Sequence, residues 1–455
     1  MQQKIYETDW LASRPVFYNE MTHQVSFNIN DVIDFRNLEF HEEGFNNFLD
    51  FGYSILEQTP IKNVKFLPHS SRLTIQDDGK FLIEQFRDPV EDWLEKISHE
   101  DDVWELLREA IQSWEDSVDG EIVIPTSGGY DSRILNLFIK DKSRIQSFTY
   151  GVSDNQSQSF EVINAQKISE ILGTKWSQIS LGDYHLFFDE WDKEFGVSVH
   201  AHGMYHIEFY QQIISKVRGN NPFLSGIVGD AWSGNVNIPE IRLASEIKLL
   251  SYSHGLNADS HYSYLNTKNN CLLENYYETN QEKLKFPIFR VVEAIRFKIV
   301  LLSYLLTIPQ SFGFNPWSPF LIPEIALSML TLPLDRKQNR IWQQDFFRKH
   351  GLDIESMKIR KSYQNNLNFQ AWKRIPLQPL NTNLLANYID LSYLEWINQE
   401  LTQKTLIRKQ LLELQCLPKI GGLLIRLRTN ESHYRAYAAY LTLKPIEKVL
   451  SQSSC

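Results

Sequence analysis

The chain has 455 residues, of which 42% are hydrophobic and 22% charged, a composition that is ordinary for a globular protein of two or three domains. Its formal charge of −10 and its pI near 5.7 argue against nucleic acid as a partner. The longest apolar stretch, about residues 299–308, is much shorter than the roughly twenty residues that cross a bilayer, so we expect no membrane span.

The cysteines and the first residues bear on the compartment. Cys271, Cys416 and Cys455 lie far apart and form no CxxC pair, which predicts a reducing compartment without a disulfide framework or a structural zinc. The first residues have no apolar leader segment, so we expect a cytoplasmic protein. Residues 401–450 run against the overall charge, with nine Lys or Arg against three Glu. This bias fits a solvated helix face, a phosphorylated substrate or a membrane surface.

Residues 1–92 are expected to form a small β-rich domain. Residues 14–18 and 24–28 have strand character, and residues 72–76 and 80–86 flank an Asp77-Asp78-Gly79 turn, which predicts a hairpin. From Asp101 to Val118 apolar residues recur at helical spacing, and two aspartates at the start suit a helix cap. A domain boundary near residue 92 follows.

Residues 93–375 alternate between predicted strands and helices. Strands are expected at 122–124, 145–150, 176–179 and 223–225, and helices after residue 132, over 160–172 and from about residue 204. Such alternation predicts an α/β fold with a parallel sheet. Beyond residue 240 the sequence is mostly of helical type, and residues 376–455 are expected to form a helical extension of this domain.

The most informative motif is Ser127-Gly-Gly-Tyr-Asp-Ser132, directly after the strand at 122–124. A strand end that turns through two glycines into a helix points several backbone N–H groups and the positive end of the helix dipole at one spot. Phosphate fits such a spot, and Asp131 suits a bridging magnesium ion. An ordinary Gly-Gly turn is the alternative.

This motif resembles the pyrophosphate loop of the N-type ATP pyrophosphatases, SGGxDS. A P-loop would instead need GxxxxGK[ST], with a lysine on the β- and γ-phosphates, and the segment has no such lysine. The resemblance implies that magnesium-ATP is cleaved between its α- and β-phosphates, so that pyrophosphate leaves and a substrate becomes its adenylate.

A second glycine-rich loop, Leu224-Ser-Gly-Ile-Val-Gly-Asp-Ala-Trp-Ser-Gly234, resembles the G-x-G-x-D-E loop of asparagine synthetases. Together with Ser147-Phe-Thr-Tyr-Gly151 and Pro316-Trp-Ser-Pro-Phe-Leu-Ile-Pro-Glu324, the order of motifs resembles the synthetase domain of that family over most of residues 100–370. The resemblance implies a PP-loop sheet, of the adenine nucleotide alpha hydrolase type, for residues 93–375.

The same resemblance implies the site residues. ATP and pyrophosphate would be bound by Ser127, Gly128, Gly129, Asp131, Ser132, Tyr150, Gly151 and Gly229. Asp131 and Asp230, two carboxylates from different strand ends, would hold magnesium. Lys361, with Lys358 and Arg360 as competitors, would stabilise charge in the transition state. A turn hydrogen bond for Asp230 and a solvated basic turn for Lys361 are the alternatives.

The N-terminal segments resemble parts of the glutaminase domain of the same family. Residues 8–18 resemble its D-x-x-G-x-R-P-L-Y-Y stretch, and residues 67–70 its L-P-P-G segment. That glutaminase uses an N-terminal cysteine, whereas here Met1 is followed by Gln2 and no cysteine precedes Cys271. We therefore expect residues 1–92 to be a truncated, inactive glutaminase-like domain. Nitrogen would come from ammonia, an amine-bearing substrate or a separate glutaminase.

Several residues depart from the family pattern or stand outside it. Ile227 and Val228 stand where asparagine synthetases have an acidic residue, and Ala231 replaces the glutamate that follows, which disfavours aspartate as the substrate. Arg133 suits a phosphate, a carboxylate or a surface salt bridge. His200, His202 and His206 form an HxH pattern with an i, i+4 continuation, which suits a contact to substrate or a metal site.

The function expected is that of an ATP-dependent amide ligase, which adenylates a small-molecule carboxylate and transfers ammonia or an amine to it, releasing AMP and pyrophosphate. By family analogy the acid would be a uronic acid or a peptide-like acid from polysaccharide or natural-product biosynthesis. Modification of tRNA is a rival, disfavoured by the acidic charge and the lack of an RNA-binding module. A non-catalytic nucleotide-binding scaffold, partner of an amidotransferase complex, is another.

Overall fold

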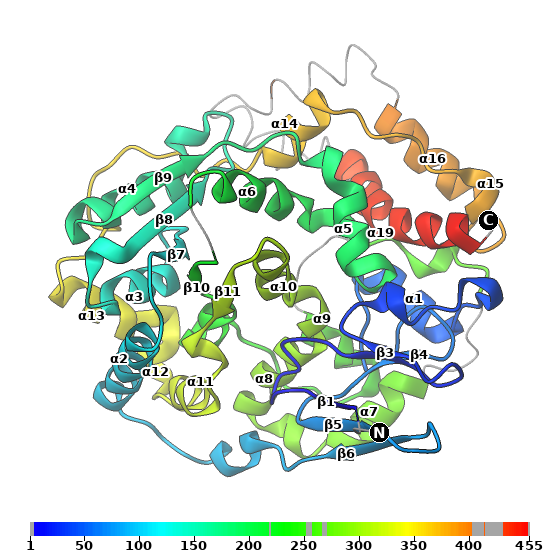
Figure 1. The fold of residues 1–455 in the computed structure, drawn as a ribbon, viewed down its shortest axis with the longest axis horizontal. Helices are drawn as coiled ribbons and strands as arrows, with labels where there is room; N and C mark the ends of the chain where they lie inside the picture. Colours follow the sequence, from blue (N-terminus) through cyan, green and yellow to red (C-terminus); the bar gives the residue numbers. More distant parts are fainter. Residues whose placement is uncertain are drawn as a thin grey trace.

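The computed structural model describes residues 4–217, 220–251, 257–265, 271–402, 414 and 431–453. Its central sheet, in the left part of Figure 1, has the strand order β11-β10-β7-β8-β9, and every pair is parallel. These strands are β7 (Ile122–Pro125), β8 (Ile145–Tyr150), β9 (Lys175–Ile179), β10 (Pro222–Leu224) and β11 (Asn315–Trp317). The prediction of an α/β fold with a parallel sheet is confirmed at this level, and β11 is a strand that the sequence did not predict.

The strand order shows how the chain winds. It moves outward from β7 through β8 to β9, then returns to the other side of β7 to add β10 and β11. Because such crossovers are right-handed, the helices of the two windings cover opposite faces of the sheet. Ile122, Val123 and Ile124 of β7 are all fully buried, as expected for a central strand covered on both faces.

The helices of the first winding follow the sequence prediction closely. α3 (Tyr130–Phe138) packs on β7, and α4 (Phe160–Leu172) packs on β8 and β9 and ends at Gly173, whose φ of +69° gives a left-handed cap. α2 (Glu100–Asp116) begins after His99, which makes no side-chain cap, so the two expected capping aspartates lie in its first turn. In the crossover to β10 come α5 (Phe188–Phe195) and α6 (Met204–Ile214).

The N-terminal residues form two small antiparallel sheets. One has the order β1 (Ile5–Glu7), β5 (Ser71–Ile75), β6 (Phe81–Gln85), and the other the order β3 (Val25–Ser26), β2 (Phe17–Asn19), β4 (Val64–Phe66). The predicted hairpin is present as β5 and β6, with Gly79 at a φ of +82° in the turn. A ten-residue helix, α1 (Glu42–Phe51), also lies here and was not predicted.

The rest of the described chain is mostly helical, as predicted. Its helices are α7 (Cys271–Asn280), α8 (Pro287–Phe297), α9 (Ile299–Leu302), α10 (Tyr304–Ser311), α11 (Pro323–Leu330), α12 (Leu334–Lys337), α13 (Ile341–Lys349), α14 (Leu367–Arg374), α15 (Thr382–Leu385), α16 (Leu391–Thr402) and α19 (Glu431–Ser453). None of the described helices is long and apolar enough to cross a membrane. Most of the basic segment 401–450, and Cys416 and Cys455, lie outside the described residues.

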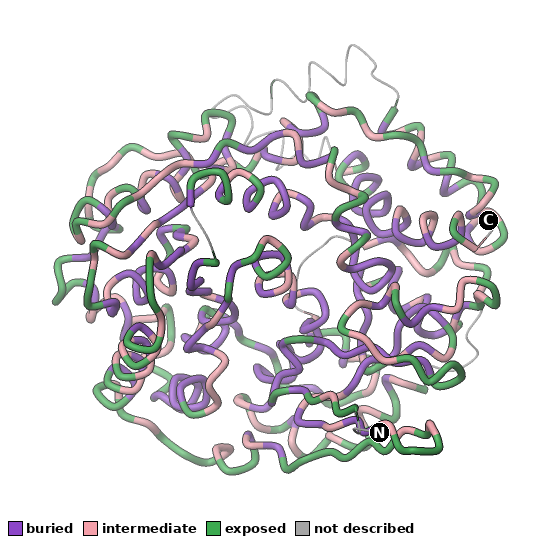
Figure 2. The backbone as a smooth tube through the Cα atoms, viewed as in Figure 1, coloured by how far each residue is buried: buried purple, intermediate pink, exposed green. Residues whose placement is uncertain are grey.

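One hydrophobic core extends through both halves of the molecule. It includes Trp10 and Phe45 near the N-terminus, the strands of the parallel sheet, and Leu450 in α19. In Figure 1 the red helix α19 lies beside the blue helix α1, and the two are in contact. The purple of buried residues accordingly continues from the sheet into α19 in Figure 2.

Candidate functional site at the carboxyl edge of the sheet

The two glycine-rich loops leave neighbouring strands at the place where the strand order reverses. β7 leads into the loop before α3, and β10 leads into the loop that reaches Asp230. These strands pair in parallel, with Phe223 opposite Val123, so both loops leave the same edge of the sheet. A crevice outside the carboxyl ends of the strands at such a reversal is the usual ligand site of open α/β sheets.

The first loop has the conformation that an anion site needs. Gly128 has a φ of +75°, and a Cβ placed there would lie 2.4 Å from Cβ of Asn164 in α4. Gly129 is the N-cap residue of α3. Because it has no side chain, it makes no capping hydrogen bond to the first-turn N–H groups. Ser127 and Gly129 are exposed, whereas Ser132 is buried and donates a hydrogen bond to the carbonyl of Gly129, 3.1 Å away.

Arg133 anchors this loop from inside the protein. Its side chain is fully buried, and it donates to the carbonyl oxygens of Gly128 (3.0 Å) and Leu352 (2.8 Å). It also forms a bidentate pair with Glu355, at 2.8 and 2.9 Å. The sequence allowed a phosphate, a carboxylate or a surface salt bridge as the partner of Arg133. The structure shows a carboxylate, and the arginine of this pair is buried while Glu355 is partly exposed.

Asp131 and Asp230 are brought together, as the sequence predicted. A Cβ on Gly229 would lie 2.8 Å from Cγ of Asp131, and the charge of the next residue, Asp230, acts on the Asp131 carboxyl. Burial, and then the charge of Asp230, raise the pKa of Asp131 well above its usual range. Oδ1 of Asp131 is buried and has no hydrogen-bond partner among the described residues, while Asp230 accepts from Nδ2 of Asn235 at 3.2 Å.

Three cationic side chains lie around this pair or its loops. Lys298, at the junction of α8 and α9, is fully buried, and burial lowers its pKa to about 7 against the attraction of Asp230. The guanidinium of Arg340 lies 4.7 Å from the centre of the Tyr130 ring, and its charge lowers the pKa of Asp131. Nζ of Lys361 donates to Oδ1 of Asn164, 3.0 Å away, the residue against which Gly128 packs.

Lys298 and Arg340 were missed by the sequence reasoning. Lys298 left a signal, because it is a lone lysine in the apolar run Phe297-Lys-Ile-Val-Leu-Leu302, where burial of a charge needs a reason. Arg340 had no such signal in the sequence. It lies between α12 and α13, far along the chain from both loops, and has a φ of +58°. In the second loop Ile227, Val228 and Ala231 are all buried, so this part of the loop is packed as core.

Tyr150 and Gly151 are placed by packing. The Tyr150 ring lies 5.2 Å from that of Phe209 and 5.7 Å from that of Tyr205, and burial raises its pKa above the ordinary value. A Cβ on Gly151 would lie 2.2 Å from the carbonyl oxygen of Gln156, so glycine is required by the adjacent turn. Both residues thus have a structural reason that does not involve a ligand.

The three histidines do not form a metal centre in the described part of the chain. Nδ1 of His200 accepts the backbone N–H of His202 at 3.1 Å, which caps the short helix Ala201–Gly203. His206 packs against Tyr205 and Tyr304, and burial lowers its pKa to about 3. Among the described residues, the grouping with metal-ligand spacing is instead His69, Asp88 and Glu293, with ligand atoms within 4.8 Å of one another.

Comparison with known proteins gives one family match. The model of the polyphenol oxidase middle domain matches residues 4–46, about a tenth of the chain, which extend from β1 into α1. None of the curated proteins matches the chain. The matched residues lie outside the parallel sheet and its two loops.

This match corrects the family resemblance drawn from the sequence. Residues 8–18, which were compared with a glutaminase domain, lie within a segment that matches a different family. The assignment to the asparagine synthetases was wrong, and with it fall the ATP-dependent amide ligase and the cofactors ATP and magnesium. The physical reason is that a Gly-Gly strand end beside two carboxylates specifies a place suited to an anion and a cation, but no single ligand or reaction.

Proposed function

We propose that the carboxyl edge of the sheet binds a small molecule through an oxyanion group, together with a cation held by Asp131 and Asp230. The observation that carries this proposal is the buried, unpartnered Oδ1 of Asp131, which lies beside a second carboxylate at the reversal of strand order. A carboxylate in that position is costly unless a proton or a cation compensates it.

The surrounding groups support the anion half of the proposal. The first-turn N–H groups of α3 offer donors, and Ser127 and Gly129 in the loop before it are exposed. Lys361 lies beside this loop, where its charge favours an anion. The packing of Gly229 on Asp131 and the hydrogen bond made by Ser132 keep both loops in place. The ligand is a small molecule in this proposal, because the chain's net negative charge repels a polyanion such as nucleic acid.

Binding of Mn²⁺ and of inorganic phosphate tests this proposal. We expect Mn²⁺ to bind the wild-type protein in titrations followed by electron paramagnetic resonance, and phosphate to tighten that binding. Asp131→Asn and Asp230→Asn should each weaken Mn²⁺ binding at least tenfold. Asp119→Asn is the matched control, since Asp119 is exposed before β7, away from the carboxyl edge. Unchanged Mn²⁺ affinity in both site variants would refute the proposal.

The family match favours a second candidate, oxidation of a phenol. Such chemistry needs a redox-active centre, for example copper held by imidazoles. The matched residues contain His23 and His41, and neither belongs to a group with metal-ligand spacing in the described part of the chain. His41 instead accepts the backbone N–H of Gly44 as the cap of α1. Oxygen uptake with catechol, measured with and without added copper, tests this candidate, and absence of uptake would exclude it for that substrate.

A further inference from the structure

A cleft of about 620 Å³ opens between the N-terminal sheets and the helices α7 and α8. It shares no residue with the site at the sheet edge. Its walls are partly aromatic, with Phe66 and Phe86 on one side and Tyr276 and Phe297 on the other. Four carboxylates, Glu57, Asp88, Glu91 and Glu293, and three cationic side chains, Arg87, Lys283 and Arg296, also line it.

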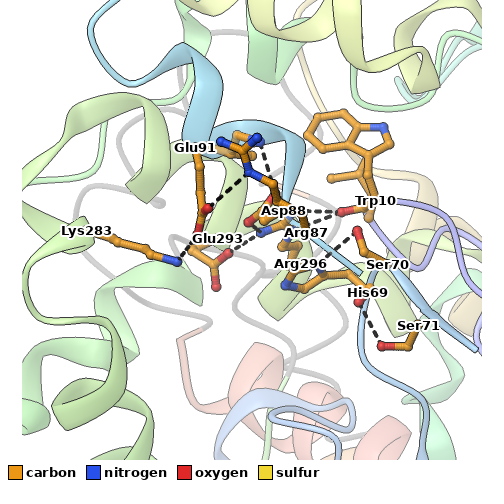
Figure 3. A network of polar contacts seen from close by, with 12 residues as sticks. Trp10, His69, Ser70, Ser71, Arg87, Asp88, Glu91, Lys283, Glu293 and Arg296 are labelled. Carbon is orange, nitrogen blue, oxygen red and sulfur yellow. Dashed lines mark hydrogen bonds and ion pairs between the residues drawn. The ribbon is translucent and has the colours of Figure 1, made fainter. Parts of the chain in front are cut away.

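Arg296 forms ion pairs with two of these carboxylates. Figure 3 shows it between Asp88 and Glu293. Its Nη1 donates to Asp88 (2.7 Å) and Glu293 (2.8 Å), its Nη2 to Asp88 (2.8 Å), and its Nε and Nη2 to the carbonyl of Trp10. All five N–H donors of the guanidinium are therefore used. Tyr276 donates to the remaining Glu293 oxygen.

This arrangement argues against a metal ion on His69, Asp88 and Glu293, although their spacing would allow one. A metal would have to share both carboxylates with a guanidinium that already lies within 2.8 Å of them. The positive charge of Arg296 also acts on His69: burial and that charge lower the pKa of the imidazole to about 4. His69 is therefore neutral at pH 7 and offers the cleft a hydrogen-bond acceptor.

Glu57 differs from the other carboxylates of the cleft because it lacks an ionic partner in the described part of the chain. Glu91 pairs with Lys283 at 2.6 Å, whereas Glu57 has no ion pair or side-chain hydrogen bond within the described residues. Solvent reaches its carboxylate through the cleft, but the surrounding protein, and then Glu293, raise its pKa to about 7. Leu56 and Glu57 both have positive φ, +50° and +58°, in a tight turn that normally uses Asn and Gly. This strained turn places Glu57 in the cleft wall.

We propose that this cleft binds an organic cation, a primary ammonium group on an aromatic or apolar body, with Glu57 as its counter-ion. The positive charge of the ligand would pair with Glu57, whereas Glu91, Asp88 and Glu293 already have ion pairs. The aromatic walls accept the body of the ligand, and neutral His69 accepts a hydrogen bond from the ammonium group. The chain already places cations on aromatic faces here, since Lys283 lies 5.9 Å from the ring centre of Phe289 and Arg72 lies 5.2 Å from that of Phe86.

Calorimetric titration with phenethylammonium chloride tests the proposal. We expect one site per chain in the wild-type protein, and at least tenfold weaker binding of 2-phenylethanol, which has nearly the same shape without the charge. Glu57→Gln should weaken the amine about tenfold or more and leave the alcohol unchanged. Glu84→Gln, an exposed position on β6, should bind both compounds as the wild type does.

The outcomes separate the alternatives. Equal affinity for amine and alcohol, or full amine binding by Glu57→Gln, would overturn the proposal. So would absence of amine binding accompanied by binding of Zn²⁺ alone that is lost in His69→Ala, because this pattern would make the cluster a metal site. The comparison of the two compounds needs only wild-type protein, so it stands even if the Glu57 variant folds poorly.

Discussion

Asp131 and Glu57 are both carboxylates whose pKa is raised by the surrounding protein, but Glu57 is open to solvent and their neighbours differ. Asp131 lies against a second carboxylate, Asp230, and these two negative charges attract a cation, whereas the nearby Lys298 and Arg340 attract an anion. Glu57 lies in an aromatic-walled cleft in which the other carboxylates already have partners. The first setting suits a small inorganic cation, and the second suits a larger organic one.

Glu57→Gln should change how stability depends on pH. The pKa of Glu57 is about 7 in the folded protein against an ordinary value of 4.5, so between these pH values the unfolded chain loses the proton first and wild-type stability falls as pH rises. Glutamine has no such loss. We therefore expect Glu57→Gln to have a higher melting temperature than wild type at pH 8 but not at pH 4.

The difference in melting temperature between wild type and Glu57→Gln depends little on the other titrating groups that face Glu57. His69, Glu293, Asp88, Arg296 and Lys283 are present in both proteins, so their own effects on stability largely cancel in the difference. Glu84→Gln should show the same difference from wild type at both pH values. A gain at pH 4 equal to that at pH 8 would mean that the proton of Glu57 has no part in the effect.

Gly128→Ala should destabilise more than Gly173→Ala. Both glycines have left-handed φ, +75° and +69°, which costs alanine about 1–2 kcal/mol. A Cβ at Gly128 also overlaps Asn164 at 2.4 Å, whereas Gly173 has open space around it. The overlap adds about 1–3 kcal/mol. Urea unfolding of the two variants measures the difference, and equal losses would show that the loop can move away from α4.

Residue-level prediction from sequence succeeded where local geometry is decisive. Asp131 and Asp230 could be placed together because both follow parallel strands, whose carboxyl ends share one edge of the sheet. Lys298 and Arg340 could not, since they approach the pair through the packing of helices far along the chain. The aromatic cluster around the Tyr150 side chain could not be predicted either, because the order of strand residues does not say which neighbours surround a side chain.

At the scale of elements, residues 352–363 are fastened to the sheet side of the molecule at several points. Ser362 exchanges backbone hydrogen bonds with Gln158 (2.7 Å) and Phe160 (2.9 Å), and Lys361 reaches Asn164 in α4. Arg133 in α3 binds the start of this segment at Leu352 and Glu355. The segment therefore carries Lys361 to the first loop only while these contacts hold.

Arg133→Met should loosen this segment. The variant loses three contacts to residues 352–355 and leaves Glu355 without its partner, at a cost of about 2–4 kcal/mol, because Glu355 is half exposed and the pair is only partly desolvated. We expect faster proteolysis within residues 353–366. Arg108→Met, which removes an exposed ion pair on α2, should leave the cleavage rate unchanged. Equal rates in both variants would show that the other contacts suffice.

Element prediction followed the strength of the sequence signal. The bounds of β8 and α4 match the prediction, and each element ends at a glycine, Gly151 or Gly173, which marks its end in the sequence. β11 was missed because it has three residues, one of them Pro316, and Pro is disfavoured in strands except at edges, where β11 lies. α1 was missed although Phe45, Phe48 and Leu49 have helical spacing, because it is short and lies in a region dominated by strand signals.

At the scale of the whole molecule, the continuous core predicts cooperative unfolding. The sequence divides the chain at residues 92 and 375, yet Trp10, Phe45 and Leu450 belong to one hydrophobic core. We expect one calorimetric transition, and Phe45→Ala, which removes a fully buried ring at a cost of about 3–5 kcal/mol, should lower that entire transition. A separate low-temperature transition in Phe45→Ala would show that residues 1–92 unfold on their own.

The reversal of strand order also has a kinetic consequence. Asp131 and Asp230 are contributed by the two windings of the chain, so the pair exists only after β10 has returned across β8 and β9 to pair with β7. Contacts that close such long loops form late, because their entropy must be lost before any contact compensates it. During refolding, the capacity to bind a cation at this edge should therefore appear after the helical signal, as a reporter of sheet closure.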